Sequence, residues 1–180
     1  GHILGSAMVH LHVGNGLHNL VYSADMKFGK SVMLSPAATK FPRLETLFLE
    51  STYGGRDNIL PTKKETYEYL KDAIMDTFAK KGKCLIPVLG SGRAQDLMVM
   101  IEELIRTKQL PKVDVYIDGI IWDISAIHTT YPEFLNSSIR KQIFHKDNNP
   151  FLSDIFKRVG SAKERKKVIE ETESCIILAT

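Results

Sequence analysis

Cysteine, net charge and long apolar runs are all scarce in this sequence of 180 residues. The two cysteines, Cys84 and Cys175, are too few for a disulfide framework and lack zinc-finger spacing, so we predict buried thiols in a reducing compartment, the cytoplasm. The formal net charge of +3 permits a nucleic-acid partner without indicating one. No apolar run approaches the roughly 20 residues that span a bilayer, so we expect no membrane partner.

The pattern of the chain changes near residue 56. Before it, alternating apolar residues predict strands over 7–13, 17–25 and 44–50, and after it helical and strand-like segments alternate, which predicts a parallel sheet flanked by helices. The helices are expected near 62–82, 93–108, 132–142, 151–157 and 161–171, and the strands near 83–90, 113–119 and 174–180. The apolar run 83–90 further predicts a strand that is buried on both faces. We therefore expect an α/β fold with domains at 1–55 and 56–180. Both ends of the sequence fall within strand-like segments, so we expect an excerpt of a longer protein.

Three polar residues stand in turns beside the predicted strands of the first domain: His2, Asp25 and Glu50. A neutral imidazole suits zinc, and a carboxylate can bridge two cations. Each residue also has an ordinary explanation, since His2 could cap a turn, Asp25 could form an Asx turn and Glu50 could be a surface carboxylate. The combination predicts part of a hydrolytic metal centre.

The segments GHILGSAM at 1–8, YSADMKFG at 22–29 and ESTYGG at 50–55 occur in the order and spacing of a known family. Further matching segments are IPVLGSGRAQDLM at 86–98, VYIDGIIWDISAIHTTYPEFL at 115–135, FHKDNNPF at 144–151 and CIILAT at 175–180. The sequence resembles the beta-CASP family of metallo-β-lactamase-fold ribonucleases, in particular the archaeal homologues of the cleavage and polyadenylation specificity factor nuclease. The resemblance implies that 1–55 is the C-terminal part of a metallo-β-lactamase αββα half. It implies that 56–180 is a beta-CASP domain, incomplete at its C-terminal end.

The resemblance also implies a role for each of the three polar residues. His2 matches a zinc ligand, Asp25 matches a carboxylate that bridges two zinc ions, and Glu50 matches an acidic residue that supports the site. Asp25 and Glu50 are thus the candidate catalytic residues, and His2 and Asp25 the candidate metal ligands. The family usually has Thr-Gly before the bridging aspartate, whereas this chain has Ser23-Ala24, and alanine tolerates a positive φ poorly. The HxHxDH motif that supplies most zinc ligands is expected outside this chain, and the HLH segment at 10–12 does not replace it.

The turn Gly90-Ser91-Gly92-Arg93 joins a predicted strand to the N-terminus of a predicted helix, where N–H groups and the helix dipole favour an anion. It is either a tight connection or a contact for an RNA phosphate through Arg93 and the turn residues Gly90 and Gly92, and the resemblance favours RNA. Because it lacks a full GxGxxG fingerprint, nucleotide binding is a weaker interpretation. His128 could line the RNA cleft or lie in the core.

These expectations describe a ribonuclease with two zinc ions that hydrolyses RNA phosphodiester bonds in RNA 3′-end processing or transcription termination. This chain alone is expected to be inactive, because most of the zinc ligands would lie outside it. RNA is the expected partner, and a C-terminal segment outside the chain could mediate a homodimer. The alternative is a catalytically inactive paralogue that binds RNA as a scaffold, and an intact HxHxDH motif upstream would favour the enzyme.

Overall fold

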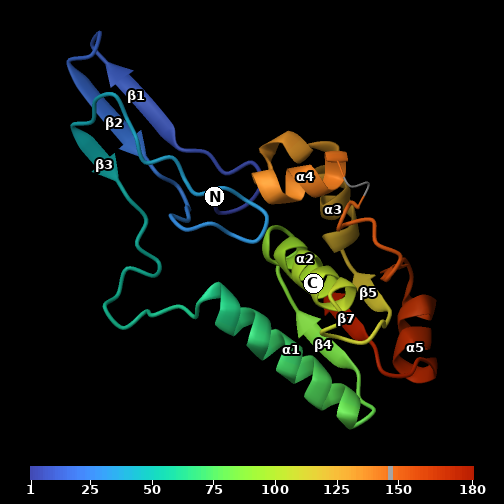
Figure 1. Cartoon of the computed structure of the whole chain (residues 1–180). Helices are drawn as coiled ribbons and strands as arrows, with labels where there is room; N and C mark the ends of the chain where they lie inside the picture. Colours follow the sequence, from blue (N-terminus) through green and yellow to red (C-terminus); the bar gives the residue numbers. More distant parts are fainter. Residues whose placement is uncertain (146–147) are drawn as a thin grey trace. The chain divides into compact units, whose positions relative to one another are not determined.

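A computed structural model describes residues 1–145 and 148–180 of the chain (Figure 1). Lys146 and Asp147, which belong to the FHKDNNPF segment, lie outside the described residues. The chain divides into two compact units, Gly1–Leu60 and Pro61–Thr180. None of the helices in the described part has both the length and the apolar character needed to cross a membrane.

The first unit is built on a three-stranded sheet in the order β1-β2-β3. β1 (Val9–Val13) and β2 (His18–Tyr22) form an antiparallel hairpin, and β3 (Thr46–Phe48) pairs with β2 in parallel. The hairpin turn at 14–16 has positive φ at all three residues, which the Gly-Asn-Gly sequence accepts at low cost. The three predicted strands are confirmed, although β3 is shorter than 44–50.

Asn19 anchors the third strand of this sheet. It is 1% exposed, and both its backbone N–H and its Nδ2 donate to Oε2 of Glu45, at 2.7 and 2.8 Å. The hydrogen bond from the Asn19 side chain, helped by the Arg43 guanidinium, lowers the pKa of Glu45 to about 2. Because β3 is held parallel to β2, the carboxyl ends of both strands lie at the same edge of the sheet.

The second unit contains a parallel sheet of four strands in the order β4-β7-β5-β6. Figure 1 labels β4, β5 and β7 of this sheet. The strands are β4 (Cys84–Pro87), β5 (Val115–Asp118), β6 (Phe156–Val159) and β7 (Ile176–Ala179). The helices are α1 (Lys63–Ala79), α2 (Arg93–Arg106), α3 (Ile121–Thr130), α4 (Ser137–His145) and α5 (Ala162–Glu171), with a 3-10 turn at Pro132–Phe134. The α/β class with a parallel sheet flanked by helices is confirmed.

The two faces of this sheet are covered by different helices. Right-handed crossovers place α5 on the face opposite α2 and α3. On the α5 face, Val168 packs near Tyr116 of β5 and Ile177 of β7. On the other face the central strands contribute the fully buried side chains Val115, Ile117, Ile176 and Leu178.

Local chemistry explains where α1 begins and ends. Glu65 N–H donates to Oγ1 of Thr62, and Thr62 N–H donates to Oε2 of Glu65, which confirms the predicted capping box. At the other end Lys81 adopts a left-handed φ of 54°, and the N–H of Gly82 donates to the carbonyl of Thr77. This pattern of bonds satisfies the last carbonyls of the helix and ends it.

Two predictions about the second unit are wrong. The segment 83–90 is not buried on both faces, because Leu85 of β4 is 61% exposed; β4 is also the first strand in the sheet order of the described residues. Residues 151–157 do not form a helix, since β6 begins at Phe156 and its two central residues, Lys157 and Arg158, are exposed, as suits the edge of a sheet. The helix expected near 132–142 is a 3-10 turn followed by α4, which starts after Asn136 accepts hydrogen bonds from the N–H groups of residues 138 and 139.

Candidate metal centre and nucleic-acid interface

The structure brings His2 and Asp25 together in the first unit. Asp25 follows the end of β2, and His2 lies in the segment that precedes β1, just before the turn at 3–5. Nε2 of His2 is 3.8 Å from Oδ2 of Asp25, and the two side chains are 36% and 74% exposed. An imidazole nitrogen and a carboxylate oxygen therefore point toward the same accessible space.

Glu50 is joined to the same turn through the backbone. Its N–H donates to Oγ of Ser23 at 3.1 Å, and its Oε2 accepts the N–H of Thr52 at 2.8 Å. Hydrogen bonds from Thr52, together with the backbone of Met26 and the nearby His2, lower the pKa of Glu50. Glu50 is therefore ionised at neutral pH and held beside the turn that carries Asp25. The structure thus places all three predicted residues at one edge of the first sheet.

These residues fit part of a zinc site. Neutral imidazole and carboxylate are ordinary zinc ligands, and the atoms of His2 and Asp25 are close enough to contact one ion. Across residues 1–145 and 148–180, however, there is no group of three or more His, Cys, Asp or Glu residues that could hold a metal ion. This chain therefore supplies two candidate ligands, and a closed site would need others. A hollow of about 250 Å³ adjoins Asp25, with Met8, Met26 and Phe41 in its lining.

Ala24, immediately before Asp25, has a left-handed φ of 47°. An L-residue other than glycine is strained in this region. We expect Ala24→Gly to raise the free energy of unfolding of the first unit by about 1 kcal/mol, measured by chemical denaturation. Ala38→Gly is the control: Ala38 is exposed and is not among the residues with positive φ in the described chain, so it should give no gain. Equal effects of the two variants would show that Ala24 is not strained.

The Gly90–Arg93 turn is organised by a buried glutamine. Gln95 is 0% exposed, its Oε1 accepts the N–H of Gly92 at 2.8 Å, and its Nε2 donates to the carbonyl of Gly90 at 3.0 Å. The Gly92 N–H is thus already occupied within the protein, so the turn presents fewer free amides than expected. Sequence reasoning missed Gln95, although a Gln at the third position of a helix is a known capping signal.

Of the predicted phosphate contacts, the Arg93 side chain is the one that reaches solvent. It is 50% exposed, and its Nη1 lies 3.9 Å from Oδ2 of Asp96. Gly90 has a packing role, because a Cβ atom at this position would lie 2.5 Å from Cγ2 of Ile120. Arg93 can therefore meet an anion, whereas Gly90 and Gly92 allow the close turn that positions it.

His128 lies inside the second unit. It is 1% exposed, its Nδ1 is 2.9 Å from the carbonyl of Ile124, and its ring centroid is 5.8 Å from that of Phe151. Its Nε2 has no hydrogen-bond partner among the described residues. This position favours the core alternative, and we propose no RNA contact for His128.

Burial lowers the pKa of His128 below its ordinary value of 6.5. The unfolded chain therefore binds this proton more readily than the folded chain does. The contribution of neutral His128 to the free energy of unfolding is complete above pH 6.5, and it is lost as the pH drops from 6.5 toward the folded pKa. We expect the melting temperature to fall over this window, and His128→Leu to flatten the slope. His18, an exposed residue of the first unit, is the control, and His18→Gln should keep the slope. An unchanged slope in His128→Leu would contradict the prediction.

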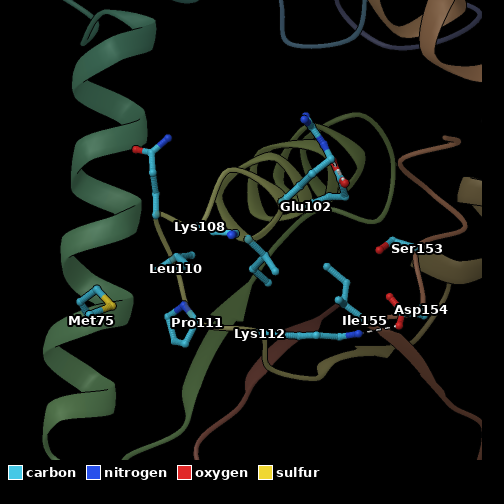
Figure 2. Close-up of a pocket in the computed structure, with 12 residues that line it drawn as sticks. Met75, Glu102, Lys108, Leu110, Pro111, Lys112, Ser153, Asp154 and Ile155 are labelled. Atoms are coloured by element: carbon cyan, nitrogen blue, oxygen red, sulfur yellow. Dashed lines mark hydrogen bonds and ion pairs between the residues drawn. The ribbon is translucent and has the colours of Figure 1, made fainter. Parts of the chain in front are cut away.

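A cleft of about 660 Å³ lies elsewhere in the second unit (Figure 2). It is formed by the end of α2, the loop before β5, Met75 of α1 and the loop before β6, so it lies at the amino ends of these strands. Its acidic groups are paired, since Glu102 accepts from Arg106 at 3.1 Å and Asp154 accepts from Lys112 at 2.8 Å. The cleft contains none of the predicted site residues, and ligands of open α/β sheets bind at the opposite, carboxyl ends.

Most of the second unit is similar to a known family of proteins. Residues 94–180, which include most of α2 and the strands β5, β6 and β7, match the Beta-Casp domain. This segment of the chain therefore belongs to the beta-CASP family.

Its relatives include several archaeal proteins called transcription termination factor FttA. The protein of Methanocaldococcus jannaschii is 53% identical over all 180 residues, that of Methanothermobacter thermautotrophicus 51%, and that of Lokiarchaeum 49%. The chain spans 28% of the length of each of these relatives. The similarity therefore extends through both units of the chain.

Proposed function

We propose that the whole protein of which this chain is part is a zinc-dependent ribonuclease that acts in transcription termination or RNA 3′-end processing. The observation that carries the proposal is the approach of His2 and Asp25 to 3.8 Å at the edge of the sheet where Glu50 is also held. The names of the archaeal relatives support the process, since they are called transcription termination factors.

In this proposal each side chain has one task. His2 and Asp25 hold zinc through Nε2 and the carboxylate, and Glu50, ionised and fixed by Thr52, keeps the Asp25 turn in place. Zinc, when bound, supplies the Lewis acidity that activates water and offsets charge on the phosphate. The hollow beside Asp25 leaves room for groups next to the scissile phosphate. Arg93 contacts an RNA phosphate through its exposed guanidinium.

This chain alone is inactive in the proposal, because its described residues contain no group of three potential metal ligands. The test uses the whole protein, purified with its zinc and supplied with a labelled single-stranded RNA. The proposal expects zinc near two ions per molecule, RNA cleavage, and loss of cleavage when a chelator removes the metal. RNA binding with neither zinc nor cleavage would instead establish the inactive scaffold.

A further inference from the structure

Ser23 stands between the two carboxylates of the proposed site. It follows β2 directly and precedes Ala24 and Asp25, and it is 2% exposed. Its neighbours along the chain are a half-exposed tyrosine and a residue with left-handed φ. Its own burial therefore has to be explained by what its polar groups contact.

Three hydrogen bonds of Ser23 account for this burial. Its backbone N–H donates to the carbonyl of Phe48, the last residue of β3, at 2.9 Å. Its Oγ accepts the N–H of Glu50 at 3.1 Å and donates to the carbonyl of Ala24 at 2.8 Å. The hydroxyl thus bonds to the turn that leads to Asp25 and to the residue that carries the second carboxylate.

The hydroxyl of Ser23 adds one hydrogen bond between β2 and β3 beyond the last regular pair of these parallel strands. Tyr22 of β2 is the partner of Phe48 in β3, and no strand pairing continues past this register in the described residues. One residue further on, the Ser23 side chain takes the place of the missing backbone acceptor for Glu50. Without this hydrogen bond, backbone rotation within 23–25 and 48–50 would let the ends of β2 and β3 move apart.

We propose that Ser23 is a positioning residue that fixes the Asp25 turn against the Glu50 strand end and thereby sets the geometry of the zinc ligands. This inference rests on the proposed function, since it assumes that Asp25 holds zinc. Groups that orient metal ligands typically change metal affinity about 10- to 100-fold when they are removed. The hydroxyl is the part of Ser23 that matters, so a threonine should keep the role and an alanine should lose it.

The test compares Ser23→Ala and Ser23→Thr in the whole protein, with zinc affinity measured by competition against a chromogenic chelator. Ser31→Ala is the matched control, because Ser31 is 8% exposed in the same unit and its Oγ also accepts a backbone N–H, that of Leu34 at 2.8 Å. The melting temperature of each metal-free variant reports the purely structural cost of the substitution.

We expect Ser23→Ala and Ser31→Ala to lower the metal-free melting temperature to a similar extent, while only Ser23→Ala weakens zinc binding about tenfold or more. Ser23→Thr should restore most of the affinity. Wild-type zinc affinity in Ser23→Ala, or an equal loss in Ser31→Ala, would overturn the role of Ser23 and leave the proposed function standing. A wild-type protein that binds no zinc would overturn both.

Discussion

Replacing Asp25 by asparagine in the whole protein should reduce RNA cleavage by about 1,000-fold or more, with RNA affinity changed by less than a few fold. The carboxylate is proposed to hold zinc, and a neutral amide is a poor replacement for it. A 1,000-fold loss corresponds to about 4 kcal/mol of transition-state stabilisation. The side chain is 74% exposed, and its Oδ2 lies 3.8 Å from Nε2 of His2, so little folding stability depends on it. The measurement is single-turnover cleavage of a labelled RNA, with binding followed separately.

The matched control is Asp57→Asn, an exposed carboxylate of the same unit, which should leave cleavage unchanged. Because His2 and Asp25 are proposed to act on the same metal, their effects should not add. The double variant His2→Ala with Asp25→Asn should be no slower than the worse single variant. Cleavage by Asp25→Asn above a tenth of the wild-type rate would be incompatible with a metal-holding role.

The second large effect is expected in the core of the second unit, where Gln95→Leu should lower the free energy of unfolding by about 3 kcal/mol. The leucine has a similar size but leaves the Gly92 N–H and the Gly90 carbonyl without their partners, and it removes contacts to the Ile121 carbonyl and Ser125. Each buried group left unsatisfied costs about 1–3 kcal/mol. The melting temperature should fall by roughly 10 °C.

Gln109→Leu provides the comparison for this variant. Gln109 is exposed just beyond α2, and its Nε2 donates to Oγ1 of Thr107 at 3.0 Å. Its replacement should change the free energy of unfolding by about 1 kcal/mol at most. RNA affinity should also fall in Gln95→Leu, because Gln95 fixes the turn from which Arg93 extends. If Gln95→Leu melts at the wild-type temperature, the buried network is not what stabilises the turn.

Segments with strong local signals were the ones that the sequence predicted well. The capping box at Thr62, the hairpin turn at 14–16 and the helical stripe of α2 each depend on neighbours within a few residues. β6 was missed because its two charged central residues give no apolar alternation, and its strand state comes from pairing with β5. α3 was missed because its sequence, IWDISAIHTT, is rich in β-branched residues and lacks a side-chain N-cap.

In the candidate site, the residues could be predicted from the sequence, but the contacts that hold them could not. His2, Asp25 and Glu50 were predicted because each stands in a turn beside a strand-like segment and matches a family motif. The contacts that hold them could not be predicted, since the bond between Ser23 and Glu50 exists only because β3 pairs in parallel with β2 across the irregular segment between them. Gln95 was missed for a similar reason, because its partners Ile121 and Ser125 come from another helix.

The order β4-β7-β5-β6 has a consequence for how the second unit folds. Among the four strands of the described sheet β7 comes last in the sequence, yet it lies between β4 and β5, which do not pair with each other. Until residues 176–179 have left the ribosome, β4 has no strand to pair with in the described chain, and its edge is open on both sides. These four strands therefore come together through contacts between residues far apart in the sequence, which favours slow folding and a period in which unpaired strands are exposed to other chains.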